Sequence, residues 1–151
     1  SMTVPRELSW KGDILCQKPV RELEALRKDE IVLEHGEAEI HGGAFDLVAE
    51  RDIAGDIPVR ICFNQELQIT YGHGVVSMEF LNNTGSGRTI RKARLDGLQN
   101  VRILMDVSLM EVYFNDGELV MTSRYYPEDP MTTNVSISGM EQVKGWTMSG
   151  Q

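Results

Sequence analysis

Cysteine is scarce and long apolar runs are missing from this chain of 151 residues. The two cysteines, Cys16 and Cys62, lie far apart and lack metal-type spacing, so reduced, buried thiols are favoured over the alternative, a disulfide between them. No stretch approaches the roughly 20 apolar residues of a membrane-spanning helix. The first residues also lack the charged and then apolar pattern of a secretion signal. These absences predict a cytoplasmic protein.

Positive charge is also in deficit. Fifteen Lys and Arg against 23 Asp and Glu give a formal net charge of -8. An acidic surface repels nucleic acid and anionic membranes, so neither is an expected partner. The apolar content of 41% is ordinary for a globular protein, and one core is expected at this length.

Short apolar segments alternate with turn residues along nearly the whole chain. A period of two, interrupted by Gly, Pro and Asn, is typical of the strands of an antiparallel sandwich. The expected strands cover residues 44–50, 59–63, 67–71, 75–81, 90–95, 135–137 and 143–148. Residues 31–33 and 38–40 flank Gly36 as a candidate hairpin, and residues 22–27 predict one short helix.

Residues 101–127 carry the clearest local pattern. The apolar side chains are odd-numbered from Val101 to Met105 and even-numbered from Met110 to Phe114. A change of phase would expose a hydrophobic face in a regular strand, so it predicts a bend or bulge at Ser108. Asn115-Asp116-Gly117 then supplies the positive φ angles that a tight hairpin needs.

The same stretch resembles the terminal hairpin of the C-terminal β-sandwich module in glycoside hydrolase family 32, the β-fructofuranosidases, invertases and sucrose-6-phosphate hydrolases. The matching positions are Arg102, Ile103, Asp106, Ser108, Glu111, Phe114, Asn115, Asp116, Gly117, Glu118, Val120, Thr122, Ser123, Arg124, Tyr126 and Pro127. Val107 and Leu109 depart from the pattern, which usually has Arg and Ser there. Further segments that resemble the family are Thr3 to Leu8, Gln17 to Val20, Glu22 to Arg27 and Gly85 to Gly87.

The resemblance implies an all-β fold, an antiparallel two-sheet β-sandwich of concanavalin-like or jelly-roll-like form with one short N-terminal helix. Residues 21–151 would form the module, and residues 1–20 would be the linker and first strand that follow an N-terminal five-bladed propeller. The apolar residues of that linker are expected to lie partly against the propeller: Val4, Leu8, Trp10, Ile14 and Leu15.

Family 32 enzymes carry their catalytic carboxylates in the propeller, in the motifs W-x-N-D-P-N-G, R-D-P and E-C-P. None of these occurs here: Arg51-Asp52-Ile53 lacks the proline of R-D-P and is interpreted as a strand end, and Glu79-Phe80 is not an acid/base motif. A propeller of that size needs several hundred residues. We therefore expect no catalytic, cofactor-binding or metal-binding residue. The parent glycosidase would hydrolyse terminal β-fructofuranosides with retention, and this portion alone would be inactive.

Several polar features have a structural and a functional interpretation. His35, His41 and His73 are scattered, which disfavours a metal site, and His73 between two glycines predicts a turn. Asp106 and Glu111 could form a glycosidase carboxylate pair. We favour a role in the fold, with hydrogen bonds to backbone amides at the corner.

Two further features could bind ligands. Thr84 to Arg88 resembles a phosphate-binding glycine loop, but no helical pattern follows it. Sugar stacking has four aromatic candidates, for which packing is favoured: Trp10, Trp146, Tyr125 and Tyr126.

Three functions stay open. The chain could be a structural module that packs on the propeller and stabilises it, a module that binds fructan or another carbohydrate, or an oligomerisation element that forms a homodimer. The first is preferred because the resemblance covers most of the chain.

Overall fold

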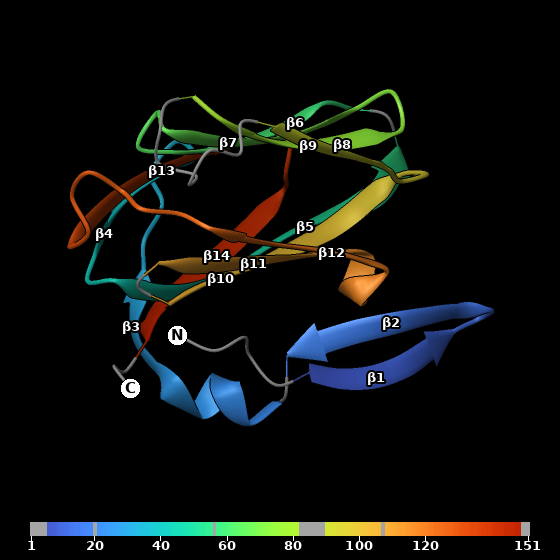
Figure 1. Cartoon of the computed structure of the whole chain (residues 1–151), viewed down its shortest axis with the longest axis horizontal. Helices are drawn as coiled ribbons and strands as arrows, with labels where there is room; N and C mark the ends of the chain where they lie inside the picture. The colour runs from blue at the N-terminus through green and yellow to red at the C-terminus, as the bar shows by residue number, and fades with distance from the viewer. Residues whose placement is uncertain (1–5, 20, 56, 82–89, 107, 149–151) are drawn as a thin grey trace.

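A computed structural model describes residues 6–19, 21–55, 57–81, 90–106 and 108–148, and these form two six-stranded antiparallel sheets packed face to face. Figure 1 shows the two layers, with a separate two-stranded hairpin and a short helix on the outer side of one of them. The predicted antiparallel β-sandwich is confirmed. No helix among the described residues is long and apolar enough to cross a membrane.

The sheet next to the hairpin is called the first sheet. Its strands, in the order β12-β11-β10-β5-β14-β3, are Leu119–Arg124, Leu109–Phe114, Leu98–Asp106, Ala44–Gly55, Gln142–Met148 and Arg27–Ile31. The predicted hairpin is confirmed, because β11 and β12 pair from Leu109–Arg124 to Phe114–Leu119 around a short 3-10 turn, η3, at Asn115–Gly117.

The second sheet lies across the core from the first. Its strands, in the order β4-β13-β6-β7-β8-β9, are Glu37–His41, Thr132–Ser138, Val59–Phe63, Leu67–Gly72, Val75–Phe80 and Ile90–Arg94. His73 has a φ of 52° between β7 and β8, so the predicted turn there is confirmed. Positive φ at His73 and Gly74 suits the right-handed twist of the paired strands.

One apolar core fills the space between the sheets. Alternate residues of each strand point inward, as Met110, Val112 and Phe114 do in β11. Phe45 of the first sheet stacks on Phe63 of the second, with ring centroids 5.8 Å apart. Cys16 and Cys62 are both buried and free, which confirms the expectation of reduced thiols.

The change of apolar phase near Ser108 is a full reversal of the chain, and the prediction of a bend or bulge within a strand was wrong. Asp106 at the end of β10 pairs with Leu109 at the start of β11. The Ser108 amide donates to the Asp106 carbonyl, and the Tyr125 amide donates to the Ser108 carbonyl. A tight turn also inverts the phase, because paired residues of the two strands point to the same side.

Two other local predictions need correction. Residues 31–33 and 38–40 do not form a hairpin: β3 belongs to the first sheet and β4 to the second, joined by a corner in which Glu34 and Glu37 form a bridge. The predicted short helix is present but is a 3-10 helix, η1, at Arg21–Leu26. Alternation identifies a strand but leaves open which sheet it joins.

The N-terminal hairpin consists of β1 (Arg6–Lys11) and β2 (Ile14–Pro19), which pair only with each other. It lies against the outer side of the first sheet, close to η3, and its tip extends past the edge of the sandwich (Figure 1).

Candidate functional site

The outer face of the first sheet holds the base of the N-terminal hairpin through one arginine. Arg6 donates to the Glu111 carboxylate at 2.7 Å, to the Gln17 side chain at 2.9 Å and to the Thr122 hydroxyl at 3.1 Å. Glu111 is only 1% exposed and also accepts a hydrogen bond from the Tyr113 hydroxyl at 2.9 Å. This ion pair therefore joins the hairpin to strands that lie about a hundred positions later in the sequence.

Burial and hydrogen bonding shift the pKa values of Tyr113 and Arg6 in this group. Burial raises the pKa of Tyr113, and its hydrogen bond to the Glu111 carboxylate raises it further. Burial alone would lower the pKa of Arg6, but the bonds to Glu111 and Tyr113 outweigh it and the pKa is raised. At neutral pH the group therefore holds a neutral phenol and a charged guanidinium.

Gly117 is a second point at which the sandwich contacts the N-terminal hairpin. Its φ is 92°, and a Cβ atom there would lie only 1.8 Å from the backbone oxygen of Gln17. The β11–β12 turn thus needs glycine for two reasons, its left-handed conformation and the close approach of β2.

The distal part of the hairpin presents apolar side chains to solvent. Leu8 is 66% and Trp10 is 71% exposed, and Leu15 and Ile14 are exposed as well. Trp10 pairs with Leu15 in the ladder, so Leu8, Trp10 and Leu15 share one face of the hairpin. These four side chains are exposed. That they lie against a propeller stays a prediction, and Val4 lies outside the described residues.

A second buried charge occupies the middle of the first sheet. Asp46 is 0% exposed and accepts hydrogen bonds from Arg27 and Arg102, each at 2.9 Å. The Arg27 guanidinium also lies 3.7 Å from the centroid of the Trp146 ring. One face of that ring is therefore already occupied by a cation.

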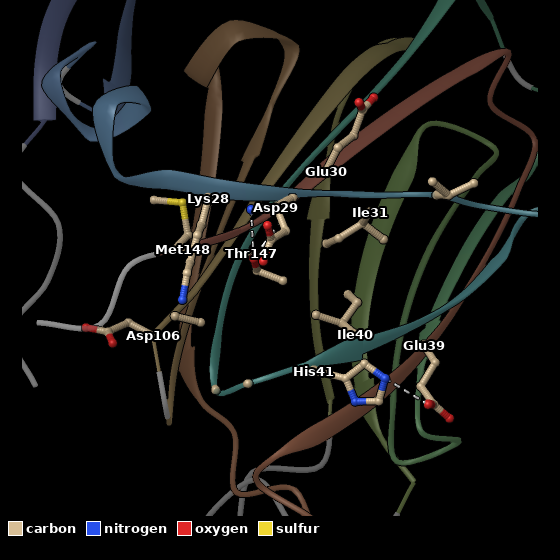
Figure 2. Close-up of a pocket in the computed structure, with 14 residues that line it drawn as sticks. Lys28, Asp29, Glu30, Ile31, Glu39, Ile40, His41, Asp106, Thr147 and Met148 are labelled. Atoms are coloured by element: carbon tan, nitrogen blue, oxygen red, sulfur yellow. Dashed lines mark hydrogen bonds and ion pairs between the residues drawn. The ribbon is translucent and has the colours of Figure 1, made fainter.

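A groove lies at the end of the two layers away from the hairpin, between the free edges of β3 and β4. It encloses about 530 Å³, with Ile31 and Ile40 among its walls (Figure 2). At its rim, the exposed side chains of His41 and Glu39 lie 3.1 Å apart, from Nε2 to Oε1. In the described part of the chain no three His, Cys, Asp or Glu side chains gather as metal ligands.

The structure separates the other candidate residues. Tyr125 is buried and donates to Glu66, so it offers no ring face to a sugar, whereas Tyr126 is exposed. Asp106 and Glu111 lie on paired strands, and the Glu111 carboxylate accepts hydrogen bonds from the side chains of Arg6 and Tyr113, where backbone amides were expected. The glycine loop at residues 84–88 lies outside the described residues.

Sequence reasoning missed both buried ionic groups. Arg6 and Glu111 are 105 residues apart, and Asp46 and Arg102 are 56 apart. A polar residue at an outward position of a strand is expected to be solvated. Here these positions are buried because η1 and the N-terminal hairpin lie on the outer side of the first sheet. Alternation gives the face but not what covers it.

Comparison with known proteins decides the family. Residues 22–147 match the family model described as "Glycosyl hydrolases family 32 C terminal". The chain belongs to this family. The resemblance found in the sequence is thus confirmed, and the family 32 sandwich spans η1 and all strands of the two large sheets.

Relatives of this family 32 chain are longer than it is. It is 30% identical to the sucrose-6-phosphate hydrolase of Vibrio alginolyticus over 99% of its own length and 31% of that protein. For the sucrose-6-phosphate hydrolase of Bacillus subtilis the identity is 29%, over 83% of this chain and 28% of that one. The chain therefore spans under a third of the length of these curated relatives.

A solved structure shows the same fold. The glycoside hydrolase family 32 protein from Bifidobacterium adolescentis superposes with a TM-score of 0.81 at 19% identity, over 98% of this chain and 26% of that one. The superposition covers the N-terminal hairpin as well as the family 32 sandwich.

Proposed function

We propose that this chain is the non-catalytic C-terminal β-sandwich module of a family 32 fructosidase, packing against the catalytic propeller of the same polypeptide and stabilising it. The observation that carries the proposal is the match of residues 22–147 to the C-terminal family, together with the chain's span of under a third of its relatives.

The chemistry of the buried carboxylates supports a structural role. A retaining glycosidase needs two carboxyl groups about 5–5.5 Å apart on either side of a sugar ring. Here Asp46 is held by two arginines, Glu111 by Arg6 and Tyr113, and Glu66 by the Tyr125 hydroxyl. Each of these groups satisfies a contact within the fold.

The proposed parent reaction is hydrolysis of the terminal β-fructofuranosyl unit of sucrose 6-phosphate. It is proposed because relatives from Vibrio alginolyticus and Bacillus subtilis bear that activity in their names. A phosphorylated sugar does not cross membranes freely, so the proposed location is the cytoplasm.

Three measurements test the function. The purified chain should release no fructose from sucrose, sucrose 6-phosphate or inulin, and the coding sequence directly upstream should encode a propeller. In the complete enzyme, deleting residues 22–151 should lower the thermal stability of the catalytic domain. Fructose release by the chain alone, or an unchanged catalytic domain after the deletion, would contradict the proposal. Binding of inulin by the isolated chain would favour the carbohydrate-binding alternative.

A further inference from the structure

Charge is divided between the two edges of the second sheet. Among the described strands, β4 with the sequence EAEIH forms one edge of this sheet, and β9 with the sequence IRKAR forms the other. The chain as a whole has a net charge of -8, so an edge strand with three basic residues in five differs from the rest of the molecule. One edge is therefore negative and the opposite edge is positive.

The charged side chains of both edges point to the same side of the sheet. β4 buries Ile40 in the core and exposes Glu37 and Glu39 on the outer face. β9 exposes Lys92 and Arg94, which pair with the outward-facing positions of β8. The acidic and the basic edge thus present their charges in one plane, on the face of the sandwich away from the N-terminal hairpin.

The strand directions allow these two edges to pair. The second sheet has six strands, each antiparallel to its neighbours, so its first and last strands run in opposite directions. A second copy that continues the sheet with the same outer face therefore places its β4 antiparallel to β9 of the first copy. In the register with Glu39 opposite Lys92, Glu37 lies opposite Arg94. Opposite charges directly across a strand pair stabilise it.

Pairing of like edges is disfavoured by the same charges. A two-fold contact of β4 with β4 centred on Glu39 would set two carboxylates against each other, and one of β9 with β9 centred on Lys92 would set two ammonium groups against each other. Like charges directly opposite are destabilising, and charged side chains on edge strands commonly block such contacts. Because each edge carries one sign, the block applies to like edges and leaves the unlike pair open.

The first sheet ends at the same two places. β3 is joined to β4 by a corner, and Arg91 of β9 donates to a backbone carbonyl of β12. The first sheet also has six antiparallel strands, with β3 and β12 as its described edges. β3 exposes Asp29 and Glu30 beside Lys28, and β12 ends at the exposed Arg124. Both layers therefore end in edges that a neighbouring copy can meet together, beside the groove of Figure 2.

We propose that the chain binds a second copy of itself head to tail, with β9 of one copy pairing antiparallel with β4 of the next. Lys92 and Arg94 then face Glu39 and Glu37 across the junction. The inference goes beyond the proposed function, because a module that packs on a catalytic domain does not need this contact. The two surfaces differ, so further copies add until a ring closes or a filament forms, in contrast to a two-fold dimer.

Sedimentation equilibrium of the chain tests the contact. Its mean mass should rise with concentration and pass two copies as the concentration approaches about 1 mM. Glu39→Lys and Lys92→Glu should each raise the dissociation constant by roughly tenfold, because an attractive cross-strand pair becomes a repulsive one. The double variant, and an equimolar mixture of the two single variants, should regain association, because opposite charges again meet at each junction.

Two results would overturn the proposal. One is a chain that stays a single copy at about 1 mM. The other is a mass that levels off at two copies, which would show a closed two-fold dimer.

Matched controls separate the edges from net charge. Glu50→Lys and Lys144→Glu make the same changes in charge at exposed positions of β5 and β14, which lie inside the first sheet. Both should leave the dissociation constant unchanged. Because every substituted side chain is exposed, far-ultraviolet circular dichroism should be the same for all four single variants. A loss of association in the controls equal to that in the edge variants would assign the effect to net charge and refute the junction.

A cross-link tests the register of the junction. Ala38 of β4 and Ala93 of β9 both pack against the margin of the core, and the proposed register places them opposite each other. Under mild oxidation, a mixture of the Ala38→Cys and Ala93→Cys chains should form disulfide-linked pairs faster than either chain alone, since Cys16 and Cys62 are buried. Linking of the Ala38→Cys chain to itself at the rate of the mixture would show two-fold pairing of β4 and refute the head-to-tail contact.

Discussion

Asp46 balances the guanidinium groups of Arg27 and Arg102 on the outer face of the first sheet. Its strand position alternates with inward-facing Phe45 and Leu47, so it points away from the core, yet it is fully buried. Removing one partner of a buried ionic group leaves the other charges without compensation, which is more costly than losing an exposed pair.

Replacing Asp46 by Asn keeps the side-chain volume but removes the charge. We expect the free energy of unfolding to fall by about 2–3 kcal/mol, less than the roughly 3–5 kcal/mol of a fully buried pair, because Arg27 and Arg102 are partly hydrated. Glu39→Gln, which breaks the exposed pair with His41, is the control and should change it by less than about 0.5 kcal/mol. Urea unfolding of the two variants measures both values, and equal effects would refute the role of Asp46.

Two buried tyrosines predict a loss of stability in alkali. Burial and acceptance by a carboxylate raise the pKa of Tyr113 and of Tyr125 above the ordinary value of 10.0. Above that pH the unfolded chain releases these protons while the folded chain keeps them, so the unfolded state binds fewer protons and stability falls as pH rises. The contribution is fully present below pH 10 and is lost toward the raised pKa.

The test compares urea midpoints between pH 8 and pH 11 for the parent chain and for Tyr113→Phe and Tyr125→Phe. Each variant should be less stable at pH 8, because a buried hydrogen bond is lost, but should decline less steeply in alkali. Tyr126→Phe is the control, since Tyr126 is exposed. Identical slopes in all four proteins would contradict the assignment.

At the scale of elements, the β11–β12 turn has two roles, reversing the chain and receiving the hairpin. Gly117→Ala should cost about 1 kcal/mol for its positive φ, and more because the new Cβ collides with the Gln17 backbone. Gly42→Ala is a close control: its φ is 101°, similar to the 92° of Gly117, but nothing lies within 4 Å of the added atom. Chemical denaturation should show the larger loss at Gly117, together with increased protease access to residues 12–13; equal losses would separate the hairpin from this turn.

At the scale of the whole molecule, the two sheets depend on one core. Phe63→Ala should cost about 3–5 kcal/mol, because a ring that stacks on Phe45 across the sandwich is lost and a cavity remains. Both sheets should unfold in one transition, seen as coincident midpoints by far-ultraviolet circular dichroism and by Trp fluorescence. Met131→Ala, at an exposed position, should change stability by less than about 0.5 kcal/mol. Separate transitions for the two probes would show that the sheets fold independently.

The amino-acid sequence by itself determined most strands of the two large sheets, the Asn115–Gly117 turn, the sandwich class and the family. These features depend on neighbours in the chain, since a period of two identifies a strand and its inward face, and positive-φ residues identify a tight turn. The family resemblance also led us to expect that Leu8 and Trp10 face a preceding domain, and both side chains are exposed in the structure.

Only the tertiary structure decided which strands share a sheet and which charges are buried. Periodicity did not distinguish a hairpin at Gly36 from a corner between layers, or a bend at Ser108 from a reversal. It also did not indicate that Arg6 meets Glu111 or that Asp46 meets Arg27 and Arg102. These contacts join segments far apart in sequence, and their partners are selected by the packing of complete sheets and by the hairpin that covers one of them, which no local pattern specifies.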